Sequence, residues 1–326
     1  MPVQRVFRLC TNECILRKSP EYSTISGLSS EAGTVDATAG RGVDGDEGFS
    51  MTEVRHDLNG SKHDFTPTYN NRWPDRYLRA HRQLDYIIPQ QAKSVFEPLI
   101  ERCMQARQKT RLKIIDVGCS YGINASLLSH RISLDELYVE AAPRTGVLST
   151  RDIDKHRAYF TDRPRRGDLS IIGLDPSKRA VEYAMRAGLI EAAVTSNLEH
   201  QDISDAEAEL IRDADLIIST GCIGYVTDRT FRRLYTATAA SRPWVASFVM
   251  HPFTYSAIAE TLTGFGLATQ EMPELLQRQR RFSTQKEKRV ILNAMKMSKM
   301  DDRFERSTSY IYASFHLSVP TGIPVG

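Results

Sequence analysis

The 326-residue sequence has few of the features that mark membrane, secreted or nucleic-acid-binding proteins. No stretch approaches the roughly eighteen consecutive apolar residues that a transmembrane helix needs, and the first residues lack the apolar core of a secretory signal. The formal net charge of +3 is small for this length, so nothing in it points to a nucleic acid or an anionic membrane as partner. The oligomeric state stays open.

Cysteine is also scarce. The five cysteines are an odd number, stand at irregular spacings and form no C-x-x-C pair. This pattern supplies neither the paired ligands of a structural zinc site nor an even disulfide framework, so no metal site is expected. Free thiols in a reducing cytoplasm are the simple interpretation, and a cytoplasmic location follows from it.

Residues 1–62 differ in composition from the rest of the chain. The stretch 23-STISGLSSEAGTVDATAGRGVDGDEG-48 is rich in Ser, Gly, Thr and Asp and shows little apolar periodicity. Such composition predicts a disordered or weakly ordered segment. Met51 is a candidate for the true start, because everything recognisably globular lies beyond it.

Residues 74–108 read as two helices that carry an apolar stripe and are broken near Pro89. From there on, apolar strand-like segments alternate with helical ones, which predicts a doubly wound and mostly parallel sheet. Ser177 is expected to cap one of the helices and Gly188 to end it. The last strand, within 307–319, alternates and mixes polar residues, as an antiparallel edge strand does. The other expected strands lie at 113–116, 169–175, 215–220, 244–250 and 266–272, with a short apolar stretch at 189–199, and the other helices lie after residue 116 and at 177–188, 204–213, 228–240 and 255–265.

The stretch 113-KIIDVGCSYGINASLLSH-130 joins a strand that ends on Asp116 to a helix through a glycine-rich turn. In doubly wound sheets, ligands bind at the carboxyl ends of the strands, and Gly118 and Gly122 allow the backbone to turn tightly and approach a ligand closely. The spacing lacks the third glycine of a dinucleotide fingerprint. It resembles motif I of class I S-adenosylmethionine (SAM)-dependent methyltransferases, with Ser120 in place of the middle glycine. The resemblance implies that the cofactor is bound by Asp116, Gly118, Ser120 and Gly122.

The resemblance also implies roles for residues at the ends of three further strands. Asp175 would accept hydrogen bonds from the ribose diol of SAM, for which a carboxylate is well suited. Asn197 and Leu198 would contact the adenine. Ser219 and Thr220 would form the floor of the methyl-transfer pocket. A sheet that binds no nucleotide, or that binds NAD, stays open as the alternative.

The resemblance spans roughly residues 110–272 and implies a Rossmann-like, seven-stranded fold with a helical lid. We assign residues 63–108 to that lid and 109–320 to a SAM-binding catalytic domain. The interval from Asp116 to Asp175 is far longer than the ~20 residues expected between such landmarks. The excess, an insertion at about 131–168, is expected to hold helices and to cover the substrate.

Five side chains are candidates for the chemistry around the sulfonium. Tyr121 lies inside the turn and Tyr77 and Tyr86 precede it, so their rings are placed to stabilise a cation. Asn124, one helical step after the turn, is a candidate for contact with the methionine moiety. His251, after the fifth strand, is a natural general base. Packing of the tyrosines at the core edge, and a structural role for the histidine, are the alternatives.

The substrate class is inferred from what is absent. The fourth strand ends in 219-STGC-222, without the Asp/Asn-Pro-Pro-aromatic tetrapeptide of base and glutamine N-methyltransferases, and the chain has no Pro-Cys nucleophile for cytosine methylation. The basic run 278-RQRRFSTQKEKR-289 is interpreted as a solvated face, with nucleic-acid contact as the alternative. A small-molecule substrate is therefore expected.

A narrower resemblance is to bacterial methyltransferase-like proteins of secondary metabolism, including azetidine-2-carboxylate synthases. In those enzymes the SAM amine attacks its own γ-carbon, methylthioadenosine leaves and no methyl group is transferred. A SAM-cyclising lyase and a non-catalytic SAM-binding protein are thus kept as alternatives to methyl transfer. The stretches that carry this resemblance are 82–99, 116–130, 133–138 and 220–231.

Overall fold

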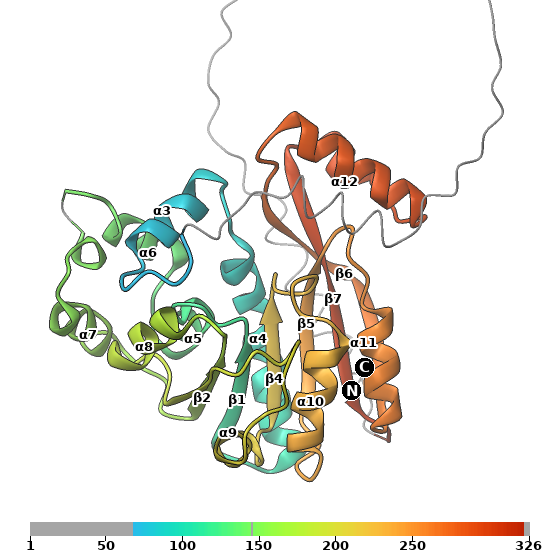
Figure 1. Cartoon of the computed structure of the whole chain (residues 1–326), viewed down its shortest axis with the longest axis horizontal. Coiled ribbons are helices and arrows are strands. Elements are labelled where there is room, and N and C mark those ends of the chain that lie inside the picture. Colours follow the sequence, from blue (N-terminus) through green and yellow to red (C-terminus); the bar gives the residue numbers. More distant parts are fainter. Residues whose placement is uncertain (1–67, 145, 323–326) are drawn as a thin grey trace, which may run out of the picture. The chain divides into compact units, whose positions relative to one another are not determined.

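The computed structural model describes residues 68–144 and 146–322 (Figure 1). The predicted weakly ordered segment 1–62, and Met51 within it, lie outside the described residues. No helix in the described part is long and apolar enough to cross a membrane.

The described residues form a seven-stranded sheet in the order β3-β2-β1-β4-β5-β7-β6. Pairings among β1 to β5 are parallel, and β7 pairs antiparallel with both β5 and β6. The predicted α/β class and mostly parallel sheet are confirmed, with a mixed rather than purely parallel order. The strands are β1 (Leu112–Val117), β2 (Leu169–Leu174), β3 (Ala192–Val194), β4 (Leu216–Thr220), β5 (Trp244–Met250), β6 (Leu267–Arg281) and β7 (Tyr310–Pro320).

The prediction that the last strand lies at the edge of the sheet is wrong. β7 lies between β5 and β6, and its residues from Ala313 to Pro320 are all buried. The edge belongs to β6, which continues to Arg281 instead of ending at residue 272. The prediction failed because polar residues of β7 form hydrogen bonds inside the fold instead of facing solvent, such as Ser314 with His316.

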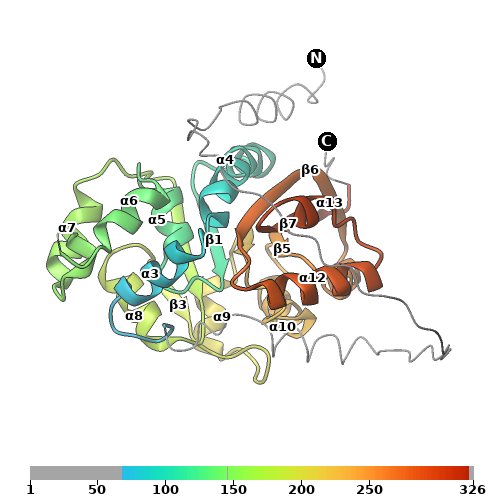
Figure 2. The same ribbon diagram turned by 90° about the horizontal axis from the view of Figure 1, so that it is seen from above.

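Helices cover both faces of the sheet, with α4 on one side and α10 on the other (Figure 2), and α11 packs against α10. Because helices cover both faces there, β2 and β5 are buried at every residue and read as nearly continuous apolar runs, whereas the edge strand β6 is partly exposed. The helices are α3 (Asp75–Gln83), α4 (Ile88–Arg107), α5 (Ile123–Ser129), α6 (Leu134–Glu140), the 3-10 turn η1 (Val147–Ser149), α7 (Ile153–Thr161), α8 (Lys178–Arg186), α9 (Asp205–Ile211), α10 (Asp228–Thr238), α11 (Ser256–Gly264), α12 (Gln285–Met297) and α13 (Arg303–Ser307).

The predicted helix boundaries are confirmed in most places. The break before α4 falls at residues 84–87, and Pro89 lies in the first turn of α4, where its missing N–H has no cost. Gly188 follows α8 with a φ of +77°. Ser177 stands at the N-terminus of α8, but its side chain makes no capping hydrogen bond there. The sequence reasoning missed α12 and α13.

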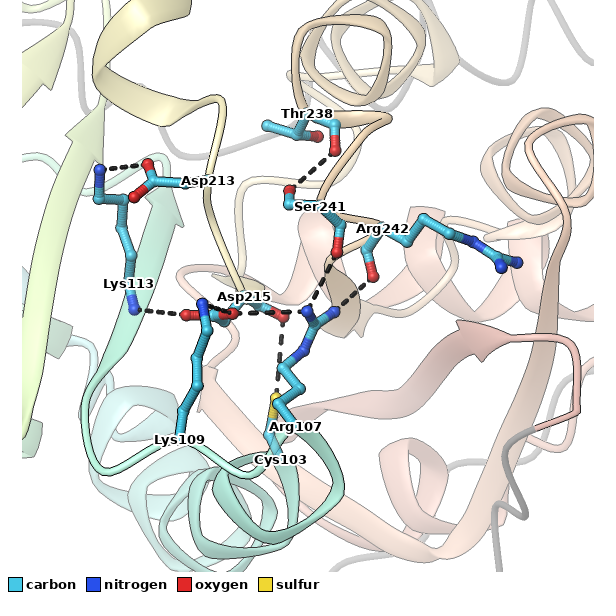
Figure 3. Close-up of polar contacts among 9 residues, drawn as sticks. All are labelled: Cys103, Arg107, Lys109, Lys113, Asp213, Asp215, Thr238, Ser241 and Arg242. Carbon is cyan, nitrogen blue, oxygen red and sulfur yellow. Dashed lines mark hydrogen bonds and ion pairs between the residues drawn. The ribbon is translucent and has the colours of Figure 1, made fainter.

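A buried carboxylate fastens the amino-terminal ends of β1 and β4 to the end of α4 (Figure 3). Asp215 is 1% exposed and accepts hydrogen bonds from the backbone N–H of Lys113 at 3.0 Å and from Nζ of Lys109 at 2.7 Å. Arg107 also pairs with Asp215 and donates to the carbonyl of Ser241 at 3.0 Å. Asp215 therefore has a structural role, at the sheet edge opposite the predicted site.

Asp215→Ala is expected to lower the free energy of unfolding by about 3 kcal/mol, because two cations and one backbone N–H lose their buried partner. Urea denaturation measures the change. Asp213→Ala is the matched control: Asp213 is exposed and pairs with Lys113 at the surface, so a change below ~1 kcal/mol is expected. Equal effects of the two substitutions would contradict the structural role of Asp215.

Candidate functional site

The carboxyl end of β1 carries a buried and only half-satisfied carboxylate. Asp116 has no exposed surface, and its Oδ1 accepts a hydrogen bond from Nδ2 of Asn124 at 2.9 Å. Its Oδ2 has no partner among the described residues. Burial raises the pKa of Asp116 to about 7, against the opposing hydrogen bond from Asn124. This group therefore gains or loses its proton close to neutral pH.

Asn124 links the turn after β1 to the end of β4. Its Nδ2 also donates to Oγ1 of Thr220 at 2.9 Å, and that hydroxyl lies 3.2 Å from Oδ1 of Asn124, to which it donates. Asn124 and Thr220, both predicted site residues and 96 positions apart, thus lie in one hydrogen-bonded group. Because Asn124 spans Asp116 and Thr220, it fixes the spacing between the two strand ends.

The turn between β1 and α5 has the backbone geometry that its glycines predict. Gly118 has a φ of +74°, and a Cβ there would lie 2.6 Å from Cβ of Cys222, so only glycine lets the β4 loop pack this closely. Ser120, in place of the middle glycine, has a φ of +47°. Gly122 is the N-terminal cap residue of α5.

Asp175 joins the end of β2 to this turn. It is 6% exposed, and its Oδ2 accepts from the backbone N–H of Ser120 at 3.0 Å while its Oδ1 accepts from that of Ser177 at 2.8 Å. Burial raises the pKa of Asp175, although both backbone donors oppose this. Each carboxylate oxygen has a second lone pair, so the group can still accept hydrogen bonds from a ligand.

An aromatic cluster lies beside the same strand ends, and we define it as Tyr69, Tyr77, His81, Tyr86 and Tyr121. Ring centroids in it lie 5.2 Å apart for Tyr69 and Tyr77, 5.2 Å for Tyr77 and Tyr121, and 4.7 Å for His81 and Tyr86. The Tyr86 hydroxyl reaches the carbonyl of Thr220 at 3.4 Å. The cluster therefore brings π faces to the edge that holds Asp116 and Asp175.

The hydroxyl of Tyr121 is engaged in this arrangement. It donates to the carbonyl of Asn71 at 2.9 Å and accepts from the N–H of Asn71 at 3.0 Å. Tyr121 thereby holds the segment before α3 against the turn. Tyr138 of α6 donates to the carbonyl of Tyr86 at 2.5 Å, so the long interval between β1 and β2 also supports the cluster.

Asn197 and Leu198 follow β3 and have separate local roles. The side chain of Asn197 is exposed, and its Oδ1 accepts from the N–H of Glu199 at 3.1 Å, which stabilises the turn. Leu198 is 2% exposed and belongs to the apolar core. Ser219 lies buried within β4 next to Thr220.

His251 lies just after β5 and pairs with a residue that sequence reasoning missed. Its Nδ1 is 2.7 Å from Oε1 of Glu305, a fully buried residue of α13. A carboxylate on Nδ1 fixes the imidazole ring in the way a general base requires. No hydrogen bond that the structure describes links His251 to the Asp116 and Asn124 group. Sequence reasoning did not identify Glu305, because α13 has only five residues, too few to show a helical apolar pattern.

The described residues contain no group of three or more His, Cys, Asp or Glu side chains that could hold a metal ion. The basic run 278–289 is not a uniformly solvated face. Arg280 within it is 2% exposed and pairs with buried Glu287 at 2.8 Å. Gln279 is equally buried and is a second residue that the sequence reasoning passed over.

No protein-family model matches this sequence, and no curated protein matches it. Among solved structures, a TehB-like SAM-dependent methyltransferase from Corynebacterium glutamicum is 14% identical, with 66% of this chain and 84% of that chain covered and a TM-score of 0.34. A magnesium protoporphyrin IX methyltransferase from Synechocystis, crystallised with bound SAM, is 12% identical over 70% and 80% of the chains, with a TM-score of 0.34. A cyclopropane-fatty-acyl-phospholipid synthase-like protein from Lactobacillus casei is 13% identical over 76% and 91%, also with a TM-score of 0.34. Likenesses at this level do not establish an activity, so the function rests on the residues of the site.

Proposed function

We propose that this protein binds SAM at the carboxyl edge of β1, β2 and β4 and transfers its methyl group to a small molecule. The observation that carries the proposal is the joining of Asp116, Asn124 and Thr220 in one hydrogen-bonded group, with Asp175 fastened to the same turn. The Oδ2 of Asp116 is buried at this edge and has no hydrogen-bond partner in the part of the chain that the structure describes, which supports a ligand with a donor or a positive charge.

The residues present fit SAM. Asp175 would hold the ribose diol and Asp116 the amino-acid end. The backbone of the turn at Asn197 and Leu198 would contact the adenine, because their side chains are engaged in that turn and in the core. The turn supplies the remaining backbone contacts through Gly118, Ser120 and Gly122, and Ser219 and Thr220 form the floor beneath the reacting centre. When bound, SAM supplies an electrophilic methyl group on a sulfonium.

The side chains of the protein would then bind and orient the reactants and accept a proton. The faces of Tyr77 and Tyr86 would stabilise positive charge at this edge, where the Tyr86 hydroxyl lies 3.4 Å from the Thr220 carbonyl. Tyr121 and Asn124 act by positioning, through Asn71 and through Asp116 and Thr220. His251, oriented by Glu305, is the candidate to accept the proton of the acceptor group. Holding the acceptor in line with the breaking bond is where most of the rate acceleration arises.

The covering layer of the site is proposed to consist of the segment from residue 68 through α3, together with α6. Contacts between α3 and α6, and the hydrogen bond from Tyr138 to the Tyr86 carbonyl, support this arrangement. On the narrower sequence resemblance, we propose that the acceptor is a small molecule of secondary metabolism.

Two measurements test the proposal. Calorimetric titration should show saturable binding of SAM and no binding of NAD, and the purified protein is then incubated with SAM, with and without a library of small-molecule acceptors. S-adenosylhomocysteine that forms only with an acceptor supports methyl transfer. Methylthioadenosine formed from SAM alone indicates the cyclising lyase instead, and binding without any product indicates a non-catalytic protein. Absence of SAM binding would reject the site itself.

A further inference from the structure

A β-bulge near the end of the edge strand β6 redirects one side chain toward the site. Arg278 pairs with Tyr312 of β7, whereas Arg280 pairs with the neighbouring residue Ile311, so Gln279 is the extra residue between them. A bulge re-aims the side chain of its extra residue. The side chain of Gln279 therefore need not follow the alternating side-chain directions of a regular strand.

The burial of β6 shows the effect of the bulge. Successive residues of a regular strand point to opposite faces, but Gln279 and Arg280 are both 2% exposed. The guanidinium of Arg280 is engaged with Glu287 at 2.8 and 3.1 Å and with the carbonyl of Arg281 at 2.9 Å. Because the Arg280 side chain is already paired, the Gln279 side chain is the one of the two that can contact a ligand.

The amide of Gln279 lies against the end of β4. Its Nε2 is 2.5 Å from the place that a Cβ on Gly221 would occupy, and the Tyr86 hydroxyl is 3.1 Å from the same place. Gly221 directly follows Thr220, which bonds to Asn124. The carbonyl of Gln279 accepts from the N–H of Ile87 at 2.9 Å, and this holds the connector that carries Tyr86.

The Oε1 of Gln279 is buried and has no hydrogen-bond partner among the described residues. Leaving such an acceptor unpaired costs about 1–3 kcal/mol, and buried polar groups in folded proteins are nearly always paired. A hydrogen-bond donor on a bound ligand would remove this cost.

We propose that Gln279 is a specificity-determining residue whose Oε1 accepts a hydrogen bond from an N–H or O–H donor of the compound bound beside Gly221 and Tyr86. This inference rests on the proposed function and deepens it. The donor has two sources, the α-ammonium of SAM and the nucleophilic N–H or O–H group of the methyl acceptor. The first serves cofactor recognition, and the second selects acceptors that carry a donor over those that do not.

The test compares Gln279→Met, which keeps the side-chain length but removes the acceptor, with the wild type by calorimetric titration. Three adenosyl probes separate the sources. S-adenosylhomocysteine has the α-ammonium, methylthioadenosine lacks it, and sinefungin has it together with an amine in place of the methyl group. Gln270→Met is the matched control, because Gln270 lies exposed on the same strand.

If the α-ammonium is the donor, Gln279→Met lowers the affinity for S-adenosylhomocysteine and sinefungin about tenfold or more. The affinity for methylthioadenosine is then unchanged. If the donor belongs to the methyl acceptor, which none of the three probes contains, their binding is unchanged, and Gln279→Met instead lowers S-adenosylhomocysteine formation with acceptors that carry an N–H or O–H donor. Unchanged binding of all three probes together with unchanged S-adenosylhomocysteine formation, while the wild type binds the probes, overturns the role of Gln279 and leaves the proposed function standing. A wild type that binds none of them overturns both. Thermal unfolding of the two variants reports separately whether either substitution harms the fold.

Discussion

Asp175→Ala is expected to weaken SAM binding about a hundredfold. The carboxylate at the end of β2 has spare lone pairs on both oxygens, and each hydrogen bond from a ribose hydroxyl to a charged acceptor contributes about 1.5–3 kcal/mol. The substitution also frees the backbone N–H of Ser120, whose geometry Asp175 maintains at 3.0 Å. Calorimetric titration with SAM measures the loss.

A graded series separates ligand contact from positioning of the turn. Asp175→Asn keeps the shape and one acceptor oxygen, so we expect a loss of about tenfold, between the wild type and alanine. Asp168→Ala is the matched control, since Asp168 lies just before β2 and pairs with Arg166 at 2.6 Å, away from the turn. SAM affinity that is equal in the wild type and Asp175→Ala would rule out the ribose assignment.

The parts of the site that the sequence predicted are those encoded by local patterns. A glycine at 118 and an acidic residue at the end of each of two apolar strands are short-range signals, and parallel strands bring their carboxyl ends to one edge. The Asp116 and Asp175 groups therefore lie at the same edge of the sheet, as expected. The ligand that they bind stays a proposal.

The parts that escaped prediction depend on long-range pairing. Gln279 is hidden in a basic run, and only the register shift between β6 and β7 turns it inward. Glu305 becomes informative only because α13 brings it to His251, 54 residues away. The interior place of β7 likewise follows from its two partners and not from its own alternation.

Asp116→Asn is expected to change the pH dependence of stability. The pKa of this carboxyl is 3.8 without the fold and about 7 within it, because burial disfavours the charged form. Between these values the folded protein keeps a proton that the unfolded chain releases. The stabilising contribution is therefore complete below pH ~4 and falls as the pH rises through 7, by about 4 kcal/mol in total.

Asparagine does not titrate, so this loss should be absent from the variant. The difference in free energy of unfolding between Asp116→Asn and the wild type should shift by about 4 kcal/mol in favour of the variant from pH ~4 to pH ~8, as urea denaturation at several pH values would measure. Asp168→Asn provides the contrast, because Arg166 lowers the pKa of Asp168 and its contribution is lost only as the pH falls. A pH-independent difference for Asp116→Asn would show that this carboxyl does not titrate near neutrality.

The same proton links stability to the ligand. A cationic donor beside Oδ2 of Asp116, which no described residue bonds, favours the charged carboxylate, so SAM binding should release a proton from Asp116 near pH ~7. Titrations in buffers of different ionisation enthalpy would detect that proton in the wild type and none in Asp116→Asn. SAM affinity of the wild type should accordingly rise from pH ~6 to pH ~8, whereas binding that releases no proton would place the positive end of the ligand away from Asp116.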